Sequence, residues 1–116
     1  MTSELRRAKR RALGQPVTVL DTMTEAVAGR LANLSSTGML LITHLPLMDD
    51  ALFQFRFTLT EPDGHERTIE LGAHQLWSDS GPVPGQFWAG FRFIDLDPED
   101  AAFLQAWVEE PGARYA

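Results

Sequence analysis

The sequence predicts an all-β domain, a six-stranded antiparallel β-barrel with a C-terminal helix, on three observations. Apolar and polar residues alternate from Phe53 to Thr60, as in a strand with one buried face. Turn-forming residues separate several such short runs, and a capped apolar stripe follows Asp97. Short strands joined by hairpins favour a closed barrel because closure removes exposed edges, and an open two-sheet sandwich is the alternative.

Four strands are expected in the first half of the chain, over residues 16–20, 25–34, 38–43 and 53–60. Gly29 lies inside the second run, which indicates a bulge or a close approach of backbone. The third run is apolar along most of its length, so we expect it to be buried on both faces. The second strand is expected to carry one alternating set on a single face: Val27, Gly29, Leu31 and Asn33.

The second half of the chain adds two strands over residues 66–77 and 86–94. A hairpin turn is predicted before them, because Pro62 presets φ and Gly64 accepts a positive φ. A loop rich in Gly and Pro over residues 80–85 separates the two strands. The in-phase sets are Ile69, Leu71, Ala73 and Trp77 in the first strand, and Phe87, Ala89, Phe91 and Phe93 in the second.

A helix is expected at about residues 97–110. Asp97 suits the N-cap, Pro98 suits the first helical position, and Pro111 with Gly112 ends the helix. Its apolar stripe, which should pack on the sheet or over a barrel end, is Phe103, Leu104, Trp107 and Val108.

Composition narrows the class of protein. The chain has 116 residues, enough for one compact domain, and its apolar fraction of 44% is ordinary for a soluble protein. It contains no Cys, which excludes disulfides and thiolate metal sites. No apolar run is long enough to span a bilayer, and no apolar segment follows the charged N-terminus as in a secretory signal. We therefore expect a cytoplasmic location without membrane insertion.

Charge is divided unevenly along the chain. Residues 1–11 carry a net charge of +4. The whole chain carries −6, so residues 12–116 carry a net charge of −10. We expect residues 1–12 to form a mobile basic arm, because close cations repel one another, and residues 13–116 to form the barrel domain. An acidic domain with a short basic arm suits a small anion better than a nucleic-acid polymer, which needs many phosphate contacts.

A second polar motif lies between two of the apolar runs. Asn33, Ser35 and Gly38 form the pattern Asn-x-Ser-x-x-Gly. Asn and Ser readily bond nearby backbone amides and favour turns, while Gly permits a positive φ or a close approach. Alone, such a turn needs no function. Together with the arginines of the arm, it indicates a two-part site for an anionic, guanine-bearing ligand.

These motifs resemble the PilZ domain family, whose members pair Arg-x-x-x-Arg with Asp/Asn-x-Ser-x-x-Gly. Two registers fit the first motif: Arg7 with Arg11, preceded by Arg6, and Arg6 with Arg10, preceded by Leu5. We favour the first, because it restores the doubled arginine found in the family. The resemblance implies that an Arg before the motif favours a stacked pair of ligands and that a Leu favours a single one. Residues 16–19, 76–77 and 90–95 also resemble the family, so the likeness covers nearly the whole chain.

The resemblance implies a site for cyclic dimeric GMP (cyclic di-GMP). Arginine bonds phosphate or guanine in bidentate fashion and stacks on bases. Asn33 offers an amide to a guanine edge, Ser35 a hydroxyl, and Gly38 room for a close approach. Trp77 is either a stacking wall or barrel packing, and both readings stay open. The implied ligand-binding residues are Arg6, Arg7, Arg10, Arg11, Asn33, Ser35, Gly38 and Trp77.

We expect a receptor or adaptor rather than an enzyme. His44, His65 and His74 are scattered, and no metal-ligand spacing or nucleophile motif accompanies them, so no catalytic residue, metal or cofactor is predicted. From the expected mobility of the arm, we hypothesise that ligand binding folds it across the barrel mouth and alters the surface offered to a partner. The resemblance implies that the downstream protein serves motility, adhesion, biofilm or exopolysaccharide output. The alternative is a PilZ-like protein–protein interaction module that does not bind the nucleotide.

Overall fold

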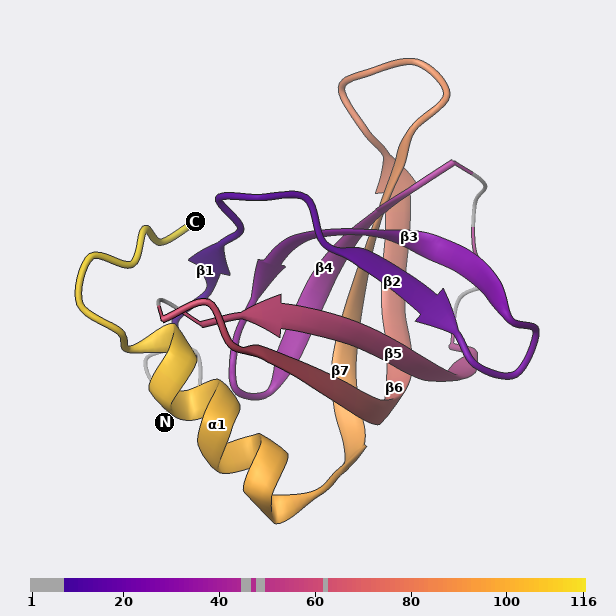
Figure 1. Ribbon diagram of the computed structural model, residues 1–116. Coiled ribbons are helices and arrows are strands. Elements are labelled where there is room, and N and C mark those ends of the chain that lie inside the picture. The colour runs from indigo at the N-terminus through magenta and orange to yellow at the C-terminus, as the bar shows by residue number, and fades with distance from the viewer. Residues whose placement is uncertain (1–7, 45–46, 48–49, 62) are drawn as a thin grey trace, which may run out of the picture.

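The protein is described by a computed structural model over residues 8–44, 47, 50–61 and 63–116. It is a closed six-stranded antiparallel barrel with one extra short strand and one C-terminal helix, which confirms the predicted fold class (Figure 1). The elements are β1 (Arg11–Ala12), β2 (Thr18–Asp21), β3 (Ala26–Leu34), β4 (Gly38–Thr43), β5 (Leu52–Thr60), β6 (Glu66–Ser80), β7 (Phe87–Leu96) and α1 (Pro98–Val108).

The barrel closes through a pairing between β3 and β4. The strand order is β1-β3-β2-β5-β6-β7-β4, and β4 pairs back onto β3. Every pairing is antiparallel. β1 and β2 pair with different parts of β3, so the extra strand extends the wall without being one of the six barrel strands.

The core fills the barrel interior. Phe55 and Phe91 are buried, with their ring centroids 5.2 Å apart in an edge-on arrangement, and Phe53 stacks on Phe55 at 5.1 Å. Burying such side chains stabilises a fold by about 1.5–3 kcal/mol each. α1 lies across one end of the barrel and adds Leu104, Trp107 and Val108 to this core (Figure 1). The predicted helical stripe is thereby confirmed.

Bulges explain where the predicted alternation is wrong. In the β2–β3 pair, Val19 lies opposite Gly29 but Leu20 lies opposite Val27, so β3 holds one extra residue. Val27 is therefore 65% exposed although it was predicted to share a face with Gly29. The bulge and the close approach predicted at Gly29 are both present, since an added Cβ would lie 2.6 Å from the Ile42 carbonyl oxygen.

β4 and β6 also differ from the prediction in detail. In β4, Met39 and Leu41 are buried, but Leu40 and Ile42 on the outer face are only half-buried. β6 extends to Ser80 and shifts register twice on β7, the second time after Gln75. This second shift breaks the phase that was expected to carry Trp77 inward.

The ends of β5–β6 and of α1 follow the sequence signals. Gly64 has a φ of +91° in the β5–β6 turn. The backbone N–H of His65 donates to the carboxylate of Asp63, and this bond holds the pKa of Asp63 below its usual value. Asp97 accepts a hydrogen bond from the Glu99 N–H at the start of α1. Among the described residues, no helix has the length and apolar character needed to cross a membrane.

Only part of the predicted arm lies within the described residues. Arg6 and Arg7 lie outside them. The chain from Ala8 onward runs to β1, where Arg11 pairs with Leu34 and Ala12 pairs with Asn33. The boundary and mobility of the arm stay predictions.

Candidate functional site

The turn between β3 and β4 is held together by Ser35. Its hydroxyl oxygen accepts hydrogen bonds from the backbone N–H groups of Thr37 at 3.2 Å and Gly38 at 3.0 Å. The hydroxyl lies 3.1 Å from the Gly38 carbonyl oxygen, to which it donates, and the side chain is buried. Because its hydrogen-bonding capacity is used within the turn, the geometry favours a role in fixing the turn over direct ligand contact.

Gly38 is required by strand packing. A Cβ at this position would lie 2.3 Å from the carbonyl oxygen of Phe91 on β7. Gly38 lies opposite Arg92 in the β4–β7 pair, and it is not among the glycines with positive φ. Gly38 therefore lies close to β7, which places the β3–β4 turn against the barrel wall, and the predicted close approach to a ligand stays a prediction.

Arg10 and Asn33 meet beside this turn. The Nη1 atom of Arg10 donates to Oδ1 of Asn33 at 3.0 Å. The two residues line a pocket of about 420 Å3 whose other walls come from β4, β6 and β7. Asn33 is only 7% exposed, so its hydrogen bond with Arg10 is partly buried rather than on an open surface.

Trp77 forms a wall of the same pocket. A Cβ on Gly90 would lie 2.4 Å from Nε1 of Trp77, so the indole ring lies directly over the bare backbone of β7. The side chain is still 44% exposed. Trp77 thus packs on the barrel and also presents indole surface at the pocket, which combines the two readings left open by the sequence.

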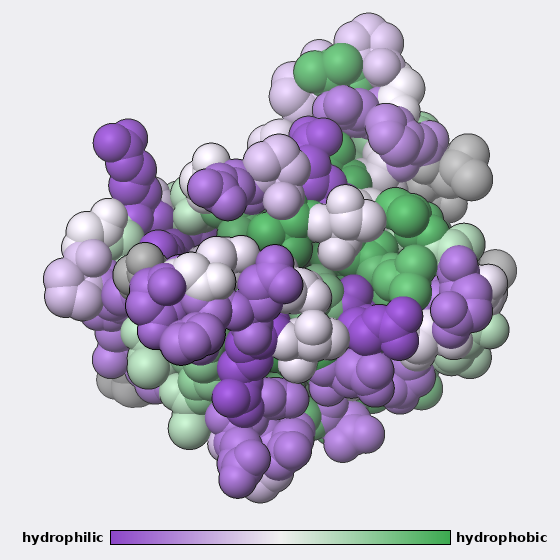
Figure 2. Space-filling view, in the orientation of Figure 1, coloured by the Kyte–Doolittle hydropathy of each residue, from purple (hydrophilic) through white to green (hydrophobic). Residues whose placement is uncertain are grey.

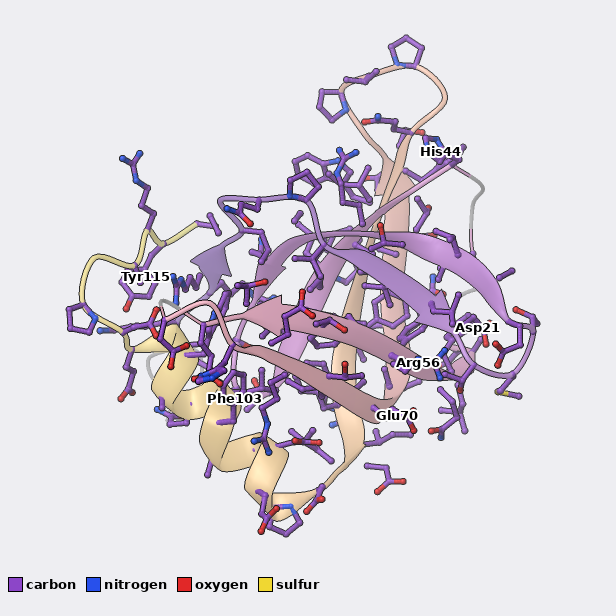
Figure 3. The ribbon with its side chains drawn as sticks, in the orientation of Figure 1. Asp21, His44, Arg56, Glu70, Phe103 and Tyr115 are labelled. Atoms are coloured by element: carbon purple, nitrogen blue, oxygen red, sulfur yellow. The ribbon has the colours of Figure 1, made fainter. Side chains whose placement is uncertain are left out.

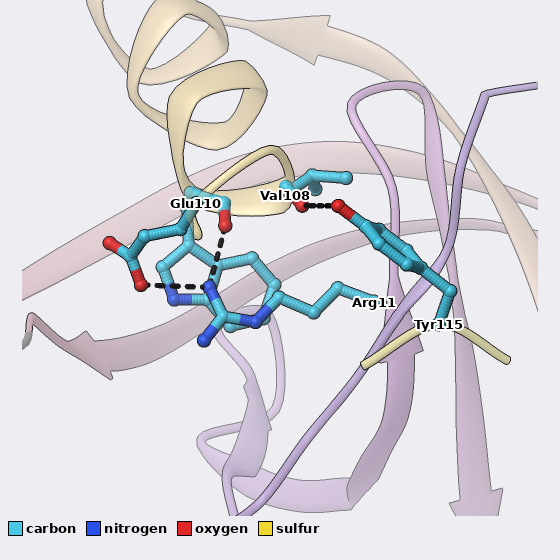
Figure 4. A network of polar contacts seen from close by, with 5 residues as sticks. Arg11, Val108, Glu110 and Tyr115 are labelled. Carbon is cyan, nitrogen blue, oxygen red and sulfur yellow. Dashed lines mark hydrogen bonds and ion pairs between the residues drawn. The ribbon is translucent and has the colours of Figure 1, made fainter. Parts of the chain in front are cut away.

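Arg11 points to the opposite side. Its Nη1 atom donates to the carbonyl oxygen of Trp107 at 2.6 Å and to Oε1 of Glu110 at 3.1 Å (Figure 4). Its guanidinium carbon lies 4.1 Å from the centroid of the Trp107 ring. These contacts stabilise the C-terminal end of α1, where the carbonyl groups and the helix dipole favour a cation.

The last residues of the chain form hydrogen bonds with the end of the arm. The N–H of Ala12 donates to the Arg114 carbonyl oxygen at 2.8 Å, and the N–H of Ala116 donates to the Arg10 carbonyl oxygen at 2.9 Å. Tyr115 donates its hydroxyl proton to the Val108 carbonyl oxygen at 2.8 Å (Figure 4). Its ring lies under the ammonium of Lys9. We call residues 112–116 the tail.

The structure therefore sorts the predicted site residues into groups. Arg10, Asn33 and Trp77 line one pocket, whereas Ser35 and Gly38 support the turn behind it. Arg11 contacts the helix, so the register favoured from sequence, Arg7 with Arg11, directs its second arginine away from Asn33. The other register directs Arg10 toward it.

Sequence reasoning missed Gly90 and the tail. Gly90 lies in the stretch 90–95 that resembles the family, but no part in the pocket was predicted for it, and nothing in the residues of the tail indicates a contact with Arg10. In the described part of the chain, no three His, Asp or Glu residues group as metal ligands would.

Comparisons with known proteins place the chain in a family. The family model of the PilZ domain matches residues 4–110. A search of curated proteins found no match. Among solved structures, the Bacillus subtilis inhibitor of motility MotI/DgrA superposes with a TM-score of 0.73 at 17% identity, over 88% of this chain and 48% of that one.

Two structures of Escherichia coli YcgR are also similar. YcgR in complex with c-di-GMP has a TM-score of 0.72 at 19% identity, over 90% of this chain and 44% of that chain. The PilZ domain of YcgR with c-di-GMP has a TM-score of 0.69 at 21% identity, over 90% of this chain and 88% of that chain. The chain spans about half the length of MotI and of the longer YcgR structure. Because the family model matches almost the whole length of the chain, the chain belongs to the PilZ domain family.

Proposed function

We propose that this chain binds cyclic di-GMP and, as a receptor or adaptor, regulates a partner protein. The observation that carries the proposal is the hydrogen bond between Arg10 and Asn33 at a pocket walled by Trp77. Both YcgR structures contain c-di-GMP, and they support the same ligand here. MotI is an inhibitor of motility, which makes motility the output we favour over adhesion, biofilm or exopolysaccharide production. A cytoplasmic location stays part of the proposal.

The three side chains suit the chemistry of the ligand. The guanidinium of Arg10 can bond a phosphate or the O6 and N7 edge of guanine in bidentate fashion. The amide of Asn33 supplies both a donor and an acceptor to a second edge. The exposed indole of Trp77 offers a flat face to a base. The body of the chain carries −10, so the anionic ligand depends on the positive charge of the arm.

We further propose that Arg6 and Arg10 form the functional register. Arg10 contacts Asn33, whereas Arg11 is held by Glu110 and Trp107. In this register Leu5 precedes the motif, which by the family resemblance implies one ligand molecule per site. Arg6, like Arg7, lies outside the described residues, so its part rests on the motif alone.

Ligand binding should change the arm. Arg10 must exchange its bond to Asn33 for bonds to the ligand, and its own carbonyl oxygen is bound by the tail. A change at Arg10 is therefore passed to β1 and the tail, which lie beside the end of α1. Such a shift alters the surface offered to a partner only if the ligand binds the two arrangements with different affinity.

Calorimetric titration of the chain with cyclic di-GMP, GTP and a short single-stranded oligonucleotide tests the proposal. We expect heat only with cyclic di-GMP, at about one molecule per chain if Leu5 precedes the functional motif and about two if Arg6 does. Hydrogen exchange of the first fifteen residues should slow on binding. The absence of binding to cyclic di-GMP would favour the alternative, an interaction module that does not bind the nucleotide.

A further inference from the structure

A second and larger cavity lies on another wall of the barrel. It has a volume of about 840 Å3 and runs between residues 13–20, which lead into and form β2, and residues 56–61 at the end of β5. It shares no lining residue with the pocket of Arg10 and Asn33. We call it the β2–β5 groove.

The groove exists because β2 and β5 pair over only a short distance. Leu20 lies opposite Arg56, and Asp21 lies opposite Phe55. No further pair follows in the direction of the β5 end, where the two ribbons diverge (Figure 1). The register of the existing pairs would bring Thr18 opposite Thr58 and Pro16 opposite Thr60. Proline has no N–H, so it cannot donate to such a ladder.

The edge of β5 therefore presents backbone groups to the groove. Gln54 accepts from the Thr22 N–H with its carbonyl oxygen at 2.9 Å, so the even-numbered residues of β5 face β2. The N–H of Glu61 donates to the His65 carbonyl oxygen at 2.7 Å, so the odd-numbered residues face the β6 side. By this alternation, the N–H and C=O groups of Thr58 and Thr60 point into the groove. No described residue forms a backbone hydrogen bond with either of them.

The opposite edge is open as well. The carbonyl oxygen of Val17 accepts from the Leu31 N–H on β3 at 2.9 Å, which turns the backbone groups of Thr18 toward the groove. Leu13 and Val17 are half-buried between the two edges. Figure 2 views this face and shows hydrophobic residues exposed between hydrophilic ones. An edge of this kind is a template for another extended chain unless something covers it.

The charged side chains of the groove leave an acidic surplus. Arg56 pairs with Glu70, which is labelled beside it in Figure 3, at 3.5 Å, and Arg11 pairs with Glu110 at 3.1 Å. Glu61 and Glu66 also line the groove, and within the described ranges neither has an ion-pair partner. A segment that carries Lys or Arg complements these carboxylates.

We propose that the β2–β5 groove binds an extended, basic segment of a partner protein, which adds as a strand to the edge of β5 at Thr58 and Thr60. Backbone hydrogen bonds would supply most of the affinity, and Glu61 and Glu66 would select for basic side chains. The proposal takes its biological meaning from the adaptor role proposed above, but its test does not depend on nucleotide binding.

The test uses the full chain, labelled with 15N, and a synthetic capped peptide of alternating lysine and valine. We expect the amide signals of Thr58 and Thr60 to shift and their hydrogen exchange to slow when the peptide is added. Two matched peptides are the controls: one with glutamate in place of lysine, and one N-methylated at alternate amides so that one edge cannot pair. Each should bind at least about tenfold more weakly.

Variants separate pairing from simple charge attraction. Thr60→Pro removes the N–H that would pair, at an edge that tolerates proline, and should weaken peptide binding about tenfold. Thr60→Val keeps the N–H and should bind as the original chain does. Glu61→Gln with Glu66→Gln should weaken binding of the lysine peptide, whereas Glu99→Gln on the first turn of α1 should not. Thermal melts confirm that each variant is folded.

Several outcomes would overturn the proposal. One is equal binding of the N-methylated and unmodified peptides, and another is the absence of shifts at Thr58 and Thr60. Slow exchange of both amides in the dilute chain alone would show that its own residues fill the groove. Protection that rises with concentration, together with dimers in sedimentation, would assign the edge to a second copy.

Peptide binding that survives in Arg10→Ala would instead support the proposal, because it would show that this site stands even if nucleotide binding fails.

Discussion

Arg10 and Arg11 are neighbours in sequence, yet they serve two different regions of the molecule. Arg10 reaches Asn33 in the pocket walled by Trp77, whereas Arg11 reaches Trp107 and Glu110 at the end of α1. The cause is the extended backbone at β1, in which successive side chains point to opposite faces. Two adjacent cations of the same motif can therefore divide between ligand binding and stability, and the predictions below test that division.

The largest expected effect is on ligand affinity in Arg10→Ala. This variant loses a charge-assisted contact at the pocket, so its affinity for cyclic di-GMP should fall about 100-fold, or ~2.7 kcal/mol. Its melting temperature should change less than that of Arg11→Ala, because Arg10 lies at the pocket whereas Arg11 contacts the end of α1. Arg10→Lys keeps the charge without the planar fork and should recover only part of the affinity. Affinity equal to that of the original chain would remove Arg10 from the site.

Arg11→Ala should show the reverse pattern. It removes a bond to the Trp107 carbonyl oxygen, an ion pair with Glu110 and a contact with the Trp107 ring. We expect the free energy of unfolding to fall by about 2 kcal/mol in a denaturant titration. Arg114→Ala is the matched control, an exposed arginine of the tail that accepts the hydrogen bond from Ala12 with its backbone carbonyl oxygen, which the substitution keeps. A loss of ligand affinity without a loss of stability would restore the register Arg7 with Arg11.

Gly90→Ala tests whether Trp77 belongs to the ligand region. The added methyl group must displace the indole, which lies 2.4 Å from the position of that Cβ. We expect affinity for cyclic di-GMP to fall about tenfold, together with a changed tryptophan fluorescence spectrum. Gly14→Ala is the control, because a Cβ there has no neighbour within 4 Å. Unchanged affinity despite a displaced ring would leave Trp77 with a packing role only.

Tyr115→Phe should have the smallest effect. It removes the hydroxyl that donates to the Val108 carbonyl oxygen and leaves the ring beside Lys9 in place. The free energy of unfolding should fall by about 1 kcal/mol in the same titration used for Arg11→Ala. If the tail helps to hold the arm, hydrogen exchange at Ala12 should also become faster. Exchange as slow as in the original chain would separate the tail from the arm.

Local sequence patterns predicted the fold well because they depend on short-range chemistry. The alternation of β5, the cap at Asp97 and the turn glycine Gly64 each act within a few residues. Val27 and Trp77 were misplaced because bulges, which depend on the partner strand, shift the phase. The use of a bulge could be inferred at Gly29, but its exact consequence for Val27 could not.

The candidate site was predictable in part for the same reason. Asn33 and Trp77 follow from the motifs, but the direction of each arginine depends on the pairing of β1 with β3, which no periodicity in so short a segment reveals. Ser35 and Gly38 also follow from the motif; their contacts within the chain are to the turn and to Phe91, and their contact with the ligand stays a prediction. A tail that contacts residues about one hundred positions away leaves no local signal at all.

The position of Tyr115 has a practical consequence. It is the one tyrosine in the sequence, and it sits where the tail, the arm and the end of α1 meet. A chain produced with fluorinated tyrosine would therefore give a fluorine signal from this residue alone, with no assignment needed. That signal would report the position of the arm during a nucleotide titration, without any foreign probe attached to the protein.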